Sequence, residues 1–223
     1  MTTKPSLPSS PRVVGPTARS STRLTIAAGT AATVVYMIGI ATVLPSDNPQ
    51  EWSVALSSQP IRAWTSVIAF STAAIAGASL LLLLARDVIG PSRKRAHAGA
   101  AIAAVGFVLN AVGTPIAYAA ATGQSWATSS ARVERARTTV DLLDAANVGL
   151  LGVGLLLLIV AQRASGTIGT PLALLGAVTA TASMAGATAV IAPAADPLRL
   201  IAGLLTLVWI IAATTRAARP RRP

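Results

Sequence analysis

The sequence predicts an all-α membrane protein, a bundle of six transmembrane helices. Only 11% of its 223 residues are charged, against about 25% in a soluble domain, and the mean hydropathy is +0.65. The apolar residues also fall in long blocks, and blocks of about 20 residues match a hydrocarbon core of about 30 Å. Backbone polar groups cannot face lipid unpaired and nothing suggests a barrel, so we expect the spans to be helices.

Six apolar blocks predict the spans in chain order. The first ends before Pro45, and the fifth begins with Thr170 as N-cap and Pro171 at the first helical position. Pro193 and Pro197 bracket a very short connection, which predicts that the last two spans form a tight antiparallel hairpin. The expected spans are 24–44, 63–84, 99–121, 140–161, 171–192 and 198–215.

Both ends of the chain are predicted to be basic cytoplasmic tails. Residues 1–23 are rich in Pro, Ser and Thr and carry no acidic residue, which indicates disorder; residues 216–223 form the second tail. The first span is longer than a signal-peptide core, and no cleavage motif follows it. The tails with the 2–3 and 4–5 loops carry 13 Lys and Arg, and the other side carries 5. This excess predicts that both termini lie inside, in a bacterial inner membrane.

Several chemistries are excluded by composition. The chain has no Cys and one His, so disulfides, thiolate catalysis, iron–sulfur clusters and a bis-His haem within one chain are ruled out. No P-loop motif and no metal-ligand spacing of His and carboxylates occurs, so we expect no cofactor and no metal ion. The basic 2–3 loop and tails are expected to contact anionic lipid headgroups rather than nucleic acid. The loop's basic residues are Arg86, Arg93, Lys94 and Arg95.

The fourth span opens with three polar residues on one face. Asp141, Asp144 and Asn147 lie within an arc of about 120° at 100° per residue. Polar residues inside a span are costly and are therefore candidates for a substrate or ion pathway. The 3–4 segment before this face has a pattern that predicts a helical extension of the span at the outer interface.

The third span carries a second polar series at i, i+4 spacing. Asn110, Thr114 and Tyr118 are expected to share a face, at depths that match the polar residues of the fourth span. Two neighbouring helices would then enclose a small polar cavity in the outer half of the bilayer. Asp144 is the residue that we expect to bind an ion, a proton or a cationic substrate there.

A structural interpretation of the same residues stays open. Asp141 has Arg137 at i−4 as a possible ion-pair partner, and both Asp residues suit a helix N-terminus. Asn110 and Asn147 are also suited to hydrogen bonds between helices. On this interpretation the polar residues hold the bundle together and bind nothing.

Three functions follow from these observations. The first is a non-catalytic accessory or interaction subunit, with a second copy or another membrane protein as partner. Sparse polar content and small-residue spacings such as Ala73-x-x-x-Gly77 favour it. The second is a small secondary transporter or ion-coupled permease that uses Asp144. The third is a membrane enzyme acting on a lipid-soluble substrate with Asp141 and Asp144, although no catalytic residue can be assigned.

The layout resembles a widespread family of small bacterial membrane proteins with a domain of unknown function. The shared features are six spans in a chain of this size, a short basic 2–3 turn, a helical segment before the fourth span and a tight final hairpin. The stretches Gln59–Gly123 and Asp141–Val190 carry the similarity. The resemblance implies no activity and no functional residue.

Overall fold

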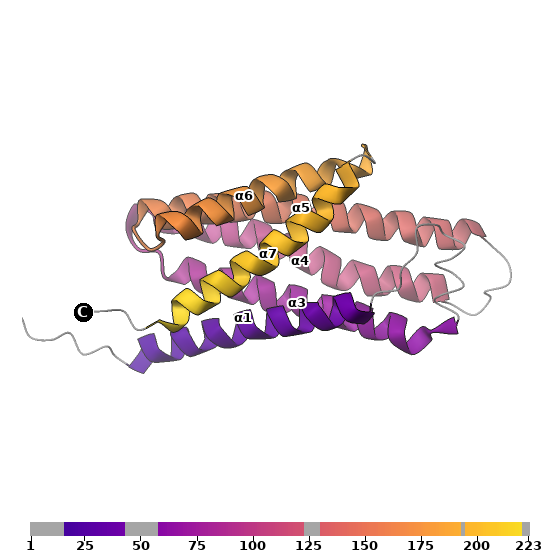
Figure 1. The fold of residues 1–223 in the computed structure, drawn as a ribbon, viewed down its shortest axis with the longest axis horizontal. Coiled ribbons are helices and arrows are strands. Elements are labelled where there is room, and N and C mark those ends of the chain that lie inside the picture. The colour runs from indigo at the N-terminus through magenta and orange to yellow at the C-terminus, as the bar shows by residue number, and fades with distance from the viewer. Residues whose placement is uncertain (1–15, 43–57, 123–129, 193–194, 220–223) are drawn as a thin grey trace, which may run out of the picture.

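The structure, a computed structural model, describes residues 16–42, 58–122, 130–192 and 195–219 (Figure 1). These ranges contain no strand. Six of their helices are long and apolar enough to cross a membrane, which confirms the predicted all-α architecture and the number of helices that could serve as spans. The long helices are α1 (Pro16–Thr42), α3 (Pro60–Arg86), α4 (Arg93–Thr122), α5 (Ser130–Ala164), α6 (Thr170–Ala187) and α7 (Asp196–Ala218), with short 3₁₀ turns η1 (Gly90–Ser92) and η2 (Thr188–Val190).

Most helices extend beyond the apolar blocks that predicted them. α1 begins at Pro16 rather than 24, and α5 begins at Ser130 rather than 140. Hydropathy marks where lipid contact ends, whereas a helix continues while its backbone hydrogen bonds continue. The predicted helical extension before the fourth span is therefore the first part of α5. Residues 1–15 and 220–223 of the expected tails lie outside the described residues.

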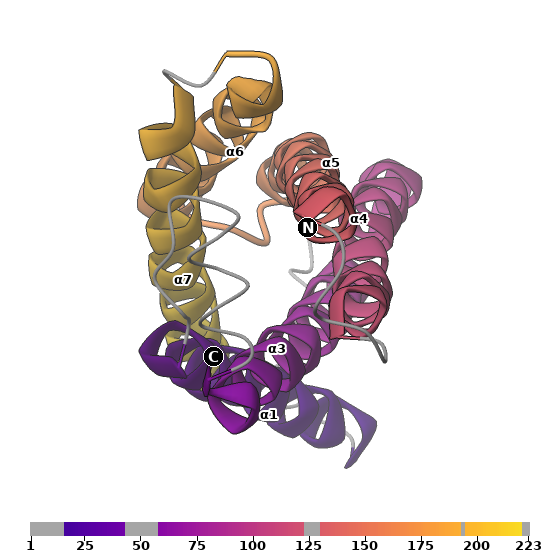
Figure 2. The same ribbon diagram turned by 90° about the vertical axis from the view of Figure 1, so that its right-hand side faces the viewer.

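The six helices form a closed ring in chain order (Figures 1 and 2). Each helix packs against the next one in sequence, and α7 packs back against α1. Successive helices run in opposite directions, so the start of α1 and the end of α7 lie at the same end of the bundle (Figure 1). We call this the termini end and the opposite one the loop end.

The closest helix pair in the ring is α4 with α5. A Cβ atom built on Gly99 would lie 2.6 Å from the backbone oxygen of Gly154, and one built on Gly154 would overlap the backbone of Gly99. Gly106, one heptad further along α4, meets the backbone of Asn147 at 3.0 Å in the same way. Small residues allow such close approach of helices in lipid, where packing drives association. The pairing of α4 with α5 therefore depends on glycine.

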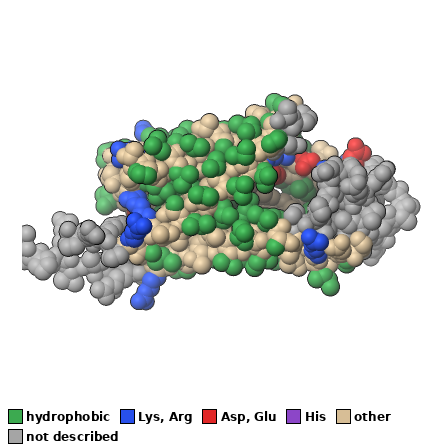
Figure 3. Space-filling view, viewed as in Figure 1, with side chains coloured by type: hydrophobic (Ala, Val, Ile, Leu, Met, Phe, Trp, Pro, Cys, Tyr) green, Lys and Arg blue, Asp and Glu red, His purple; other side chains and the backbone are tan. Residues whose placement is uncertain are grey.

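The buried core is concentrated toward the termini end. Its largest members on α3 are Leu80, Leu81 and Leu84, near the last turn of that helix. On α5, Leu155 and Leu158 are 1% and 0% exposed, and Ala96 and Ala100 of α4 complete this layer. In the space-filling view, the face of the bundle that is turned to the viewer is hollowed toward the loop end (Figure 3). Among the described residues, the ring is thus tightly packed at one end and hollowed toward the other.

The glycine contact between α4 and α5 gives a stability prediction. Gly99→Val should destabilise the bundle by about 1–3 kcal/mol, because the added carbons meet backbone that cannot move aside. Ala98→Val is the matched control, since Ala98 is the exposed neighbour on the same turn. Thermal unfolding in detergent checks this: Gly99→Val should melt lower and Ala98→Val unchanged, and equal melting of both variants would contradict the account.

Candidate functional site

A layer of apolar side chains closes the middle of the ring. It surrounds a small cavity of a size that holds about one water molecule. Its surface is apolar, and apolar cavities stay dry. We call these residues the apolar layer: Gly77, Leu81, Phe107, Leu151, Leu155, Thr206, Trp209 and Ile210.

A polar layer lies above the apolar layer, toward the loop end. Seven residues along an α-helix return to nearly the same face about 10 Å further on. Taking this step toward the loop end leads from Phe107 to Thr114, from Leu151 to Asp144 and from Thr206 to Arg199. These steps place a threonine, an acid and a base from three helices on the inward-facing stripes of the ring. We call Thr114, Asp144 and Arg199 the polar layer.

Asp144 is the charged centre of this polar layer. Its carboxylate interacts electrostatically with Arg199 of α7 and with Asp141 of α5, and Tyr36 of α1 interacts with Asp144 in turn. The Asp144 side chain is half-buried. Within the described parts of the chain, no hydrogen bond or ion pair joins its carboxylate to another residue. A half-buried carboxylate in this position can bind a cationic group from outside the protein.

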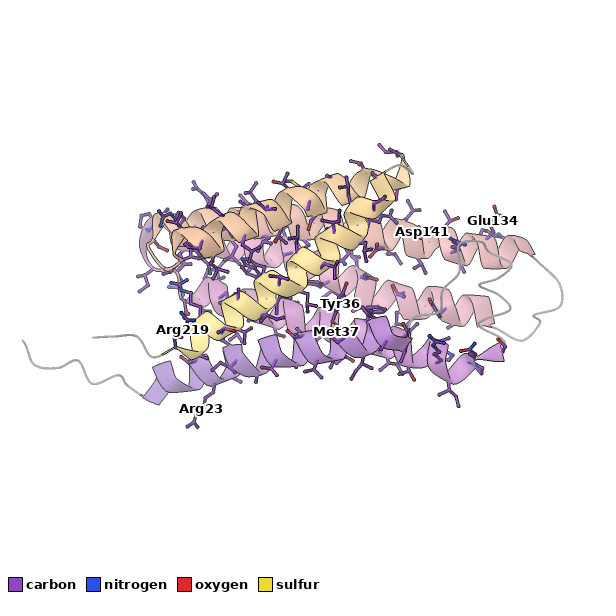
Figure 4. All side chains as sticks on the ribbon, in the orientation of Figure 1. Arg23, Tyr36, Met37, Glu134, Asp141 and Arg219 are labelled. Atoms are coloured by element: carbon purple, nitrogen blue, oxygen red, sulfur yellow. The ribbon has the colours of Figure 1, made fainter. Side chains whose placement is uncertain are left out.

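Tyr36 connects three sides of the polar layer. Its ring packs edge-to-face against Phe70 of α3, with ring centroids 5.5 Å apart. Its hydroxyl oxygen lies 2.8 Å from the position that a Cβ on Gly203 of α7 would take. Figure 4 shows Tyr36 extending from α1 into the bundle, with Asp141 on α5 further toward the loop end. Tyr36 therefore lines the same space as Asp144.

Arg199 is held at the start of α7. Its Nε donates to the backbone oxygen of Gly186 at 3.4 Å, across the α6–α7 connection. Close packing supports this contact, because a Cβ on Gly186 would lie 3.1 Å from the Arg199 backbone nitrogen. The hairpin predicted from the flanking prolines therefore fixes a positive charge at the level of Asp144.

Sequence reasoning missed Tyr36 and Arg199 as site residues. Tyr36 stands in the middle of an apolar span, and Arg199 stands inside the last span, two residues after Pro197. Both carry the signal that led to Asp144, a polar group at membrane depth. Because Arg199 stands at the expected start of the last span, it is counted instead among the loop charges that predict the orientation.

The other polar residues of α5 occupy different environments. Asp141 is exposed, whereas Asn147 is 8% exposed. The Asn147 Oδ1 is buried without a hydrogen-bond partner in the described part of the chain, and its backbone contacts Gly106 of α4. Asn147 lies one turn deeper than Asp144, between the polar layer and the α4 contact.

The three residues of the predicted polar face of α4 do not point in the same direction. Thr114 Oγ1 donates to Asn110 Oδ1 at 2.5 Å, within the same helix. Tyr118 lies against Trp64 of α3, edge-to-face with ring centroids 6.4 Å apart. Each i+4 step advances about 40° around a helix, so Asn110 and Tyr118 differ by about 80°. Thr114 remains on the stripe that leads to Asp144, and Tyr118 turns toward α3.

The helix-terminus explanation of the two Asp residues does not hold. α5 begins at Ser130, so Asp141 and Asp144 lie about three turns or more inside the helix. The favourable interaction of a carboxylate with a helix N-terminus fades within the first turn. The helix N-terminus therefore does not account for the two acidic residues, and the polar layer accounts for Asp144. No group of three or more possible metal ligands occurs among the described residues.

Comparison of the chain with protein-family models, with curated proteins and with solved structures finds no match. The resemblance to a family of small six-helix membrane proteins thus stays a prediction. The polar layer around Asp144 is the feature of the molecule from which a function can be inferred.

Proposed function

We propose that the chain is a small secondary transporter of the bacterial cell membrane that binds a cationic group at Asp144. The observation that carries this proposal is the half-buried Asp144 carboxylate, which has no hydrogen-bond or ion-pair partner in the described chain. Charged groups within membrane helices are expensive and typically mark ion or substrate pathways. An accessory or interaction subunit, the first of the three functions that the sequence favours, does not account for such a group.

The uneven packing of the ring also supports a transporter. Among the described residues, the half-buried Asp144 lies on the loop-end side of the apolar layer, and that layer, with Trp209 1% exposed, separates it from the termini end. A binding site open to one side and sealed from the other is the arrangement that alternating access requires. Release to the other side would require the side chains around Trp209 to part.

The charge distribution supports an orientation with both termini in the cytoplasm. Lys94 at the start of α4, Arg163 at the end of α5 and Arg216 at the end of α7 all lie at the termini end. Cytoplasmic loops carry the excess of Lys and Arg. Asp144 would then lie in the outer half of the bilayer, open to the outside.

Cysteine labelling in intact cells tests orientation and access together, because the chain has no native cysteine. With a membrane-impermeant maleimide, Thr139→Cys at the loop end and Asp144→Cys should react. Lys94→Cys at the termini end should react only after the cells are permeabilised. Asn147→Cys should stay protected, because this side chain is 8% exposed. Labelling of Lys94→Cys but not Thr139→Cys would reverse the orientation, and an inert Asp144→Cys would exclude an open site.

Carbodiimide labelling tests the proposed binding group directly at its carboxyl. Dicyclohexylcarbodiimide is an apolar reagent that couples to protonated carboxyl groups, and the adduct is located by mass spectrometry. We expect an adduct on Asp144, slowed by at least one cation among sodium, potassium, ethylammonium and dodecylammonium. Glu134→Gln, which removes an exposed carboxylate outside the polar layer, should leave the reaction unchanged.

The protecting cation should then cross the membrane of proteoliposomes. Asp144→Asn should lower its flux by at least about tenfold, because loss of one charged hydrogen-bond acceptor is worth about 1.5–3 kcal/mol. An unmodified Asp144, or a labelling rate that none of the four cations changes, would contradict the proposed function.

A further inference from the structure

The first and last helices of the ring separate toward the loop end. At the termini end, a Cβ on Gly29 of α1 would overlap the side chain of Thr214 of α7, so the two helices touch there. Toward the loop end, the Tyr36 side chain is needed to reach from α1 to Gly203 of α7. Figure 1 shows the two helices diverging toward the loop end. We call this boundary the α1–α7 seam.

The facing stripes of the seam are exposed beyond Tyr36. On α1, Gly29, Tyr36 and Ile40 share one face, and Ile40 is 39% exposed. On α7, the stripe that holds Thr214 and Gly203 continues to Leu200, which is 69% exposed. Neither helix covers the other at these positions, so the seam is open on its loop-end half.

The opening of the seam connects the polar layer to the lipid-facing surface. In the space-filling view, the hollow lies between α7 and the end of α1, and acidic and basic atoms gather at its upper rim (Figure 3). Asp144 interacts with Tyr36 at the seam and with Arg199 of α7, so its carboxylate lies behind this opening. The residues flanking the opening, Ile40 and Leu200, are apolar.

We propose that the ligand of Asp144 is an amphiphile, with an ammonium head at Asp144 and a hydrocarbon body that passes through the α1–α7 seam into the bilayer. This inference rests on the proposed function, in which Asp144 binds a cationic group. A water-soluble cation needs only the path from the loop end, whereas an opening flanked by exposed Ile40 and Leu200 matches a hydrocarbon chain. The ammonium group occurs both in aminophospholipids of the bilayer and in single-chain amines.

Three ligands that differ in one feature each test the proposal. Thermal stability of the detergent-solubilised protein is titrated with dodecylamine, with ethylamine, which lacks the hydrocarbon body, and with dodecanol, which lacks the charge. Dodecylamine should bind at least about tenfold more tightly than either of the others. In the Asp144→Asn variant, dodecylamine should bind no more tightly than dodecanol. In the Glu134→Gln variant, dodecylamine should bind more tightly than dodecanol, as in the wild type.

A substitution in the seam tests the route of the hydrocarbon body. Leu200→Trp should fill the opening and weaken dodecylamine binding by at least about tenfold. Val208→Trp is the matched control, because Val208 is 50% exposed on a lipid-facing side of the same helix, away from α1. Equal binding to both variants would show that the hydrocarbon body does not pass through the seam.

Native mass spectrometry after extraction from nanodiscs distinguishes the two sources. An aminophospholipid retained by the wild type and lost in Asp144→Asn, with no retention of phosphatidylglycerol, assigns the ligand to the bilayer. Retention of added dodecylamine alone assigns it to single-chain amines.

The failures of the two proposals are distinguishable. If ethylamine binds as tightly as dodecylamine, the amphiphile is wrong while a cation site at Asp144 stands. If dodecylamine binds equally well to Asp144→Asn, its binding is only hydrophobic and the amphiphile is also wrong. If instead Asp144 resists carbodiimide and no amine binds to the wild type, both proposals fail together.

Discussion

The bilayer imposes one constraint on which the rest of this structure depends: hydrocarbon offers no hydrogen bonds, so polar groups must find partners within the protein. Most of the hydroxyl groups in these helices meet it locally. Thr33 donates to the backbone oxygen of Gly29 at 2.9 Å, and Thr179 to that of Leu175 at 2.8 Å, one turn back along the same helix. Asp144 cannot do this, because a carboxylate has no proton to donate to a carbonyl. It lies instead on the inward stripe of α5, where only another charge or a ligand can compensate it.

Glycine decides where the ring is tight and where it opens. Gly99 and Gly154 bring the backbones of α4 and α5 into contact, and Gly29 makes room for the Thr214 side chain of α7 against α1, toward the termini end. At Gly203 the space is taken by the Tyr36 side chain rather than by a neighbouring helix. One end of the bundle is therefore sealed by leucine and tryptophan side chains, and the other presents acid, base and tyrosine around a hollow. The same packing that stabilises the bundle makes its two sides functionally different.

The six spans could be predicted from the sequence because hydrophobicity over about 20 residues is a local property. Asp144 could be singled out for a similar reason, since a charge inside a span stands out in the sequence alone. The closure of the ring could not be predicted: the contact of α1 with α7 joins segments at opposite ends of the chain, and hydropathy carries no information about neighbours. Tyr36 and Arg199 carry a sequence signal of their own, but their proximity to Asp144 could not be predicted because it depends on that closure. Tyr118 was grouped with Asn110 because i, i+4 spacing resembles a shared face, yet two such steps rotate it toward Trp64.

A disulfide cross-link between the first and last helices tests the closed ring most directly. The cysteine-free chain allows Gly29→Cys to be combined with Thr214→Cys, and in the control with Thr215→Cys, the exposed neighbour on α7. A protease site placed in 123–129 would separate the two cysteines on cleavage. We expect the cleaved halves to stay joined after oxidation for the Thr214 pair and to separate for the Thr215 pair. Separation of both pairs, or equal joining of both, would contradict a ring in which α7 returns to α1 and encloses Asp144.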